Sequence, residues 1–203
     1  MNTRLVLASN NAKKLIELQT LFAPLGFEMV TQDALGIAEA EEPHITFIEN
    51  ALAKARHAAS HANAAAIADD SGLCVDALAG APGVLSARYA TLFGEPKSDA
   101  DNNRMLLHKM QGIEDRRARF VSALVALRSA DDPEPLVALG RWPGEILHAP
   151  RGDGGFGYDP LMFIPALGLT VAELSAEVKN RHSHRAIASR QMLALMREVW
   201  HLG

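Results

Sequence analysis

The sequence has only one cysteine, a slightly negative net charge and no long apolar stretch. Cys74 alone cannot form an internal disulfide or a zinc site built from several cysteines. The net charge of −4 excludes a broad basic surface of the kind that binds nucleic acid non-specifically. No apolar run reaches transmembrane length, and the apolar run at 5–8 is too short for the apolar region of a signal peptide. These absences predict a cytoplasmic protein that binds neither membranes nor nucleic acid.

The order of the apolar segments predicts an α/β fold. Residues 5–31 are predicted to form a strand, a helix and a second strand, which is the order of a βαβ unit. Segments 119–128 and 136–142 flank a polar turn and predict an antiparallel hairpin, so the sheet should be mixed rather than purely parallel. The sequence shows no repeat, linker or low-complexity tract, which favours a single domain over residues 1–203.

Two capping boxes predict where helices begin. Thr46 is followed three residues later by Glu49, which predicts an alanine-rich helix that ends near residue 63. Thr170 and Glu173 have the same spacing and predict the start of a second helix.

Four glycines surround one phenylalanine in the segment 152–160, which ends in an aspartate and a proline. Glycine has no Cβ and adopts positive φ, so such a loop can press closely against a flat ligand. Phe156 offers a ring for stacking, and Asp159 offers an acceptor or a charge. Taken alone, the segment is also compatible with a tight turn whose phenylalanine packs in the core.

The polar turn Ser9 to Lys14 lies between a predicted strand and a predicted helix. Unpaired N–H groups and the positive end of the helix dipole make such a helix N-terminus suitable for a phosphate group. The spacing of a Walker loop is absent. The simpler alternative is an N-cap beside surface lysines.

Two acidic pairs are candidates for metal binding. Asp69 and Asp70 follow a predicted buried strand at 65–68, and Glu41 and Glu42 precede the capped helix. Mg²⁺ is usually bound by one or two carboxylates together with substrate phosphates, and a further carboxylate could orient a water molecule for attack on phosphorus. The alternative is a solvated acidic loop.

Further polar residues could complete a nucleotide site. Lys54 could reach the same anion, although a solvated helix lysine is the simpler interpretation. Near the last helix, Ser183 is a candidate N-cap, and Arg185 carries fixed donors suited to carbonyl or phosphate oxygens. Lys179 and His184 belong to the same polar cluster.

Together these segments resemble the inosine triphosphate pyrophosphatase family, and most closely its bacterial branch. The matching motifs cover nearly the whole chain in order: Ser9-x-Asn11-x-x-Lys14, Thr46-Phe47-x-Glu49-Asn50-Ala51 with Lys54-Ala55, Ala68-Asp69-Asp70-Ser71-Gly72-Leu73, Gly83-x-x-Ser86-Ala87-Arg88-Tyr89, Gly154-Gly155-Phe156-Gly157-Tyr158-Asp159-Pro160 and Ser183-His184-Arg185. Each motif is weak alone, but six in order are specific.

The resemblance implies an activity, a cofactor and an architecture. Members hydrolyse ITP, dITP and XTP to the nucleoside monophosphate and pyrophosphate with Mg²⁺. Their fold is a long mixed β-sheet flanked by helices, with two lobes and the active site in the cleft between them. They usually act as homodimers.

The resemblance also implies a role for each matching residue. Glu42 and Asp70 would hold the metal, and Asp70 would also be the general base, with Asp69 in support. The phosphates would be held by Ser9, Asn10, Asn11, Ala12, Lys13, Lys14 and Lys54. The remaining substrate contacts, with Phe156 stacked on the base, would come from Ser71, Phe156, Gly157, Tyr158, Asp159, Lys179, His184 and Arg185.

Two departures and two alternatives accompany this assignment. Position 10 is asparagine where bacterial relatives often carry glycine, and the alignment allows either Glu41 or Glu42 as the metal ligand. A pyrophosphatase for modified pyrimidine nucleotides is the second enzymatic hypothesis. A nucleotide-sensing module without hydrolysis is the non-enzymatic one.

Overall fold

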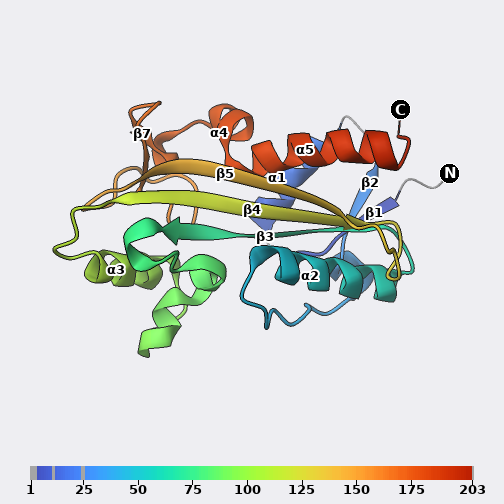
Figure 1. Ribbon diagram of the computed structural model, residues 1–203, viewed down its shortest axis with the longest axis horizontal. Coiled ribbons are helices and arrows are strands. Elements are labelled where there is room, and N and C mark those ends of the chain that lie inside the picture. Colours follow the sequence, from blue (N-terminus) through green and yellow to red (C-terminus); the bar gives the residue numbers. More distant parts are fainter. Residues whose placement is uncertain (1–3, 11, 24–25, 203) are drawn as a thin grey trace. The chain divides into compact units, whose positions relative to one another are not determined.

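The computed structural model describes residues 4–10, 12–23 and 26–202, and its strands form one mixed sheet (Figure 1). Seven strands are hydrogen-bonded in the order β2-β1-β3-β4-β5-β6-β7. Strand β1 pairs in parallel with β2 and β3, whereas β6 pairs antiparallel with β5 and β7, which confirms the predicted mixed α/β sheet. The strands are β1 Arg4–Leu7, β2 Glu28–Thr31, β3 Ala66–Val75, β4 Arg117–Leu127, β5 Leu136–Ile146, β6 Met162–Ile164 and β7 Leu169–Thr170.

Five α-helices and several 3-10 helices connect these strands within the described part of the chain. The α-helices are α1 Ala12–Phe22, α2 Phe47–Ala62, α3 Asp99–Lys109, α4 Ala176–His182 and α5 His184–Val199. The 3-10 helices are η2 Asp33–Leu35, η3 Asp76–Leu78, η4 Gly83–Phe93 and η5 Val171–Glu173. None of the helices formed by the described residues is both long enough and apolar enough to cross a bilayer.

The chain divides into two compact units. The first contains Met1–Asp70, Ser122–Gly140 and Ser183–Gly203. The second contains Ser71–Val121 and Arg141–His182. Strands β3, β4 and β5 each contribute residues to both units.

In the first unit, helices cover both faces of the sheet because the strand side chains alternate (Figure 1). Leu5 and Leu7 of β1 pack with α1 and α5, in one cluster with Leu18 and Met192. The intervening Val6 belongs to a second cluster on the α2 face, which includes a row of alanines: Ala51, Ala55, Ala58 and Ala59. These small side chains let α2 lie close to the strands.

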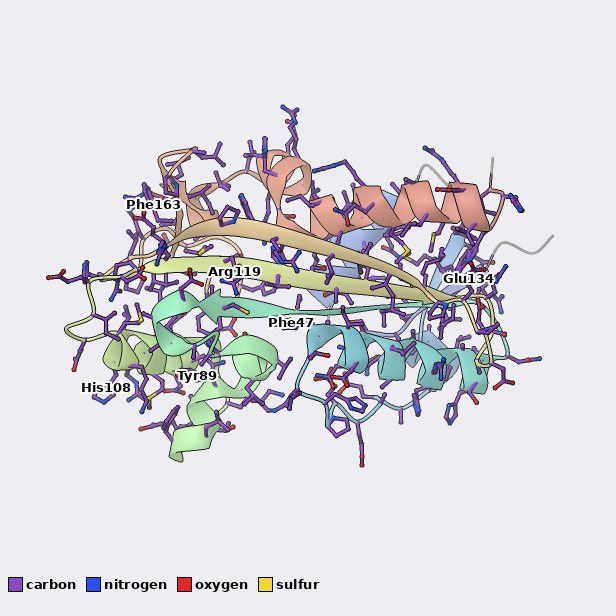
Figure 2. All side chains as sticks on the ribbon, viewed as in Figure 1. Phe47, Tyr89, His108, Arg119, Glu134 and Phe163 are labelled. Carbon is purple, nitrogen blue, oxygen red and sulfur yellow. The ribbon has the colours of Figure 1, made fainter. Side chains whose placement is uncertain are left out.

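The first predicted capping box begins the predicted helix. The second forms as a capping box but does not begin the predicted helix. Thr46 caps α2 by accepting a hydrogen bond from the Glu49 N–H at 3.2 Å; Phe47, labelled in Figure 2, is the first residue of the helix. Thr170 and Glu173 do form a capping box, but it opens a single 3-10 turn, so the predicted second helix is wrong at this position. The chain extends again at Leu174, and α4 begins only at Ala176.

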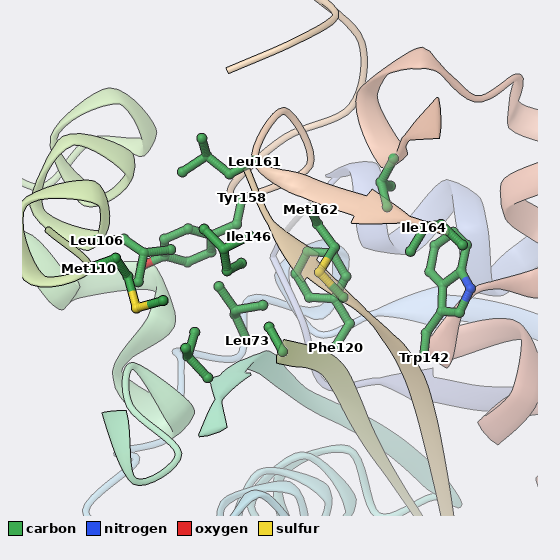
Figure 3. Close-up of a cluster of buried hydrophobic side chains, with 13 residues drawn as sticks. Leu73, Leu106, Met110, Phe120, Trp142, Ile146, Tyr158, Leu161, Met162 and Ile164 are labelled. Carbon is green, nitrogen blue, oxygen red and sulfur yellow. The ribbon is translucent and has the colours of Figure 1, made fainter. Parts of the chain in front are cut away.

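The second unit has its own apolar core (Figure 3). Leu106 of α3 and Met110, the residue that follows this helix, lie in it with the ring of Tyr158, which belongs to the glycine loop. The Tyr158 hydroxyl donates a hydrogen bond to the Ser86 carbonyl oxygen at 2.9 Å, and burial raises the pKa of this phenol above its usual value. The aromatic residue of the loop that packs in the core is therefore Tyr158, whereas Phe156 is only half-buried.

Candidate active site

The acidic pair Asp69 and Asp70 lies in the middle of β3. The expectation that the strand ends at residue 68 is wrong, because β3 continues to Val75. Both aspartates are buried, and a strand can carry two buried carboxylates here because each has charged partners. Since successive side chains of a strand point to opposite faces, Asp70 faces α2 and Asp69 faces α5.

On the α2 face, Lys54 bridges two carboxylates. Its ammonium nitrogen lies 2.9 Å from Oδ1 of Asp70 and 2.8 Å from Oε1 of Glu42. Burial alone would lower the pKa of Lys54, but the charges of Asp70 and Glu42 outweigh burial and raise it. The structure thus brings together three predicted site residues, and the glutamate that shares Lys54 with Asp70 is Glu42 rather than the exposed Glu41.

Asn50 fixes the loop that carries Glu42. Its side-chain oxygen accepts the His44 N–H at 3.0 Å, and its amide nitrogen donates to the His44 carbonyl oxygen at 3.2 Å. The same amide nitrogen lies 3.5 Å from Oδ2 of Asp70. Asn50 is 1% exposed, although its partner His44 lies at an exposed position of the loop. One buried amide therefore links the loop before α2 to Asp70.

On the α5 face, Asp69 belongs to a buried charge network. Ser122 donates a hydrogen bond to Oδ1 of Asp69 at 2.6 Å, and Nε of Arg185 lies 3.3 Å from Oδ2. The Arg185 guanidinium also reaches Glu17 of α1 at 2.8 Å. Burial opposes the charge of Arg185, but Asp69 and Glu17 raise its pKa, so the guanidinium stays charged. Asp69 thus orients Arg185, while Asp70 faces the metal candidate Glu42.

The start of α5 is held against β5. Ser183 caps the helix by accepting the Ala186 N–H at 3.2 Å, which confirms the predicted N-cap. The next residue, His184, is buried. A Cβ on Gly140 of β5 would lie 1.8 Å from the His184 carbonyl oxygen. Glycine at position 140 is therefore required for this close approach, which sets the positions of His184 and Arg185.

The predicted phosphate-binding turn precedes α1. Ser9 and the exposed Asn10 follow β1, and Oδ1 of Asn10 accepts a hydrogen bond from the amide nitrogen of the buried Gln32 at 3.1 Å. Asn11 and the side chains of Ala12, Lys13 and Lys14 lie outside the described residues. The helix backbone begins at Ala12, so the last three residues of the predicted turn already belong to α1.

In the second unit, the glycine loop is built around Asp159. Its Oδ2 accepts the Phe156 N–H at 3.0 Å and lies 3.0 Å from the ammonium nitrogen of Lys179. Lys179 also lies over the Phe156 ring, 4.6 Å from its centroid, in a cation–π contact. Asp159 and Lys179 are both buried. The structure therefore brings Phe156, Asp159 and Lys179 together. The Tyr158 side chain instead packs in the apolar core. Ser71 is the residue that follows Asp70 in β3.

Both its backbone conformation and the lack of room for a Cβ require glycine at position 155. Substitution of Gly155 therefore tests the structure of the loop. Its φ is +75°, and a Cβ would lie 2.1 Å from Oδ2 of Asp159. Gly157 has φ +59° but no atom within 4 Å of its Cβ position. We expect Gly157→Ala to cost about 1–2 kcal/mol of unfolding free energy from strain alone, and Gly155→Ala about 1–3 kcal/mol more because Asp159 must move. Urea unfolding of both variants measures the difference; equal losses would contradict the steric role of Gly155.

The arrangement is suited to metal-assisted phosphate chemistry. Among the residues that the structure describes, no group of three or more His, Cys, Asp or Glu side chains forms a closed metal site. Two carboxylates, Glu42 and Asp70, do converge on the same cationic group, the ammonium of Lys54. This donor set fits Mg²⁺, which completes its shell with water and substrate phosphates.

Sequence reasoning missed the residues that hold the others in place. Asn50, Ser122, Glu17 and Gln32 touch the predicted residues, yet none was singled out for a role. The opposite orientation of Asp69 and Asp70 is predictable from the sequence, because neighbouring side chains of a strand point to opposite faces of the sheet. The partners of Arg185 carry no such signal, since Glu17 is 168 positions away in the chain.

Comparison with known proteins places the chain in a family. The sequence model of the Ham1 family matches residues 5–195, and the chain belongs to that family. Proteins named dITP/XTP pyrophosphatase from Methylibium petroleiphilum and Leptothrix cholodnii are 69% and 68% identical to it. The alignments cover 97% and 98% of this chain and 99% and 100% of those proteins. The family expected from the sequence motifs is thereby confirmed.

Solved structures agree with the fold. A HAM1 protein from Coxiella burnetii is 41% identical, with a TM-score of 0.89 over 96% of this chain and 98% of that one. A nucleoside-triphosphatase, also named dITP/XTP pyrophosphatase, from Mycobacterium abscessus is 41% identical, with a TM-score of 0.74 over 95% and 98% of the two chains. The mixed sheet with flanking helices is therefore the fold of this family.

Proposed function

We propose that this protein hydrolyses non-canonical purine nucleoside triphosphates such as dITP, XTP and ITP to the monophosphate and pyrophosphate. The observation that carries the proposal is the partly buried cluster in which Lys54 bridges Asp70 and Glu42, both within 3 Å. The names of the relatives, dITP/XTP pyrophosphatase, support the choice of substrate.

In this proposal, Glu42 and Asp70 hold Mg²⁺. The ion would neutralise charge on the phosphate oxygens when bound. Asp70 is also assigned the proton of the attacking water, because the contact with Lys54 fixes the orientation of its buried carboxylate. Lys54 supplies positive charge to the phosphates, together with the turn from Ser9 to Lys14 at the start of α1.

Recognition of the base is assigned to two groups of residues. Phe156 stacks on the purine, on a loop held by Asp159 and Lys179. His184 and Arg185 offer donors to the 6-oxo group, and Asp69 acts by fixing Arg185. Adenine carries an amino group at this position, so these donors would face another donor instead of an acceptor. One or two unpaired buried donors correspond to about 10- to 10⁴-fold discrimination.

A pyrophosphate-release assay over a panel of nucleoside triphosphates with Mg²⁺ tests the proposal. We expect ITP, dITP and XTP to be hydrolysed far faster than ATP and GTP, with pyrophosphate rather than orthophosphate as the product. Equal turnover of all purine triphosphates would contradict the specificity. Faster turnover of modified pyrimidine nucleotides would favour the second enzymatic hypothesis, and binding of ITP without hydrolysis would favour a sensing module.

The cellular setting and assembly belong to the same proposal. The composition and the resemblance support a protein that acts in the cytoplasm as a homodimer on a free nucleotide, without nucleic acid or membrane partners. Sedimentation analysis of the purified protein tests the dimer, because a monomer at micromolar concentration would contradict it.

A further inference from the structure

Phe156 lies between two hydrogen-bonded peptide groups. In the peptide before its Cα, the Phe156 N–H donates to Oδ2 of Asp159 at 3.0 Å. In the peptide after its Cα, the Phe156 carbonyl oxygen accepts the Asp159 N–H at 3.2 Å, and the N–H of Gly157 donates to Oδ2 of Asp99 at 2.7 Å. The carbonyl oxygen of Gly157 accepts a hydrogen bond from the amide nitrogen of Asn103 at 2.9 Å. Two side chains of α3 therefore hold both polar backbone groups of the residue that follows Phe156.

Asp99 and Asn103 can act together because they lie one turn apart on α3. Residues spaced i, i+4 share a helix face, so the two side chains reach the two peptide groups on either side of the Gly157 Cα. Helix α3 is itself firmly placed: Leu106 and Met110 are buried in the core of the unit, as Figure 3 shows. Asn102 ties the helix to η4 by accepting the Ala90 N–H at 2.8 Å. The two hydrogen bonds to Gly157 therefore come from a helix, α3, whose own position is fixed.

The conformation of Gly157 makes this anchor necessary. Its φ of +59° is accessible to glycine at little cost, but glycine also leaves the backbone free to adopt many other conformations. Hydrogen bonds to both its N–H and its C=O remove that freedom. Because the Gly157 N–H belongs to the peptide that follows the Phe156 Cα, fixing it restricts the direction of the Phe156 Cα–Cβ bond, from which the ring projects.

We propose that Asp99 and Asn103 are positioning residues that orient the Phe156 ring for the nucleobase by holding the Gly157 backbone. This inference rests on the proposed function, in which Phe156 stacks on the purine. A ring that is already oriented binds the base without a further ordering cost. Neither residue need touch the substrate, and neither lies next to Asp70 in the chain, so their loss should affect binding more than turnover.

The test compares the double variant Asp99→Ala/Asn103→Ala with two matched proteins. Asp99→Asn keeps a carbonyl oxygen that can accept the Gly157 N–H, so it should behave like the wild type. Asp101→Ala removes a carboxylate from the same turn of α3, where Asp101 binds Ser98 and Arg104 rather than the loop. It therefore controls for general weakening of the helix.

Two measurements are made on each protein. Hydrogen exchange of the peptide covering residues 154–160 should be about tenfold faster in the double variant only, because two hydrogen bonds are lost. For ITP hydrolysis, KM should rise about tenfold in the double variant while kcat stays within about threefold, since the Asp70 cluster is untouched.

Each outcome decides a separate point. Unchanged exchange in the double variant would show that Asp99 and Asn103 do not hold the loop and would overturn the inference. Faster exchange with an unchanged KM would overturn it as well, because loop position would then be irrelevant to binding. If Asp101→Ala changes exchange and KM as much as the double variant does, Asp99 and Asn103 act only by stabilising α3. A wild-type protein that releases no pyrophosphate from ITP would instead defeat the proposed function, and the base-positioning role with it.

Discussion

Asp70→Asn should lower kcat for ITP hydrolysis by about 10²- to 10⁴-fold, the usual contribution of a general base. The substitution removes the proton acceptor and one of the two carboxylates proposed to hold Mg²⁺, but it hardly changes the shape of the side chain. Lys54 keeps Glu42 as a partner at 2.8 Å, so the buried ammonium is not left without a counter-charge. The protein should therefore stay folded, as far-ultraviolet circular dichroism can verify.

The matched control for this prediction is Glu41→Gln. It makes the same change of charge one residue before Glu42, at an exposed position. Pyrophosphate release by this variant should remain near the wild-type rate, because Glu41 is not the carboxylate that Lys54 contacts. An Asp70→Asn protein with a rate within about tenfold of wild type would show that Asp70 is not the base. A large loss in Glu41→Gln instead would reverse the choice between the two glutamates.

The sequence predicts the elements of the fold well because local signals specify them. Thr46 and Glu49 mark the start of α2, and the apolar alternation of β1 is enough to place it in a sheet. Local signals fail where a distant partner changes the outcome. Two adjacent aspartates were expected to end a strand, yet β3 continues because Lys54 and Arg185 compensate their charges from opposite faces.

The same distinction applies to the site. The residue types of the glycine loop and of the acidic pair were enough to identify them as candidates. Their supports come from far away in the chain: Asp99 reaches Gly157 across 58 positions, and Ser122 reaches Asp69 across 53. Neither Asp99 nor Ser122 has a local pattern that distinguishes it from an ordinary helix or strand residue. One sequence therefore suggests the reacting groups but not the side chains that orient them.

Arg185→Met should destabilise the protein by about 3–5 kcal/mol, the usual cost of removing one partner from a buried ion pair. The loss leaves the Asp69 carboxylate, which is 1% exposed, without its cationic partner, and it also deprives Glu17 of its contact at 2.8 Å. For a chain of this size, the thermal midpoint should fall by roughly 6–20 °C. Arg181→Met is the control, because Arg181 pairs with Glu177 on the surface, where ion pairs contribute about 0–1 kcal/mol.

A triple variant separates the charge penalty from simple loss of packing. In Glu17→Gln/Asp69→Asn/Arg185→Met, no uncompensated charge remains at the Asp69 position, and the asparagine can still accept the Ser122 hydroxyl hydrogen, which Asp69 now accepts at 2.6 Å. We expect this protein to regain at least about half of the lost stability, since the penalty of a buried unpaired charge is removed. If its unfolding free energy equals that of Arg185→Met, the guanidinium contributes through packing, and the network orients Arg185 by shape rather than by charge.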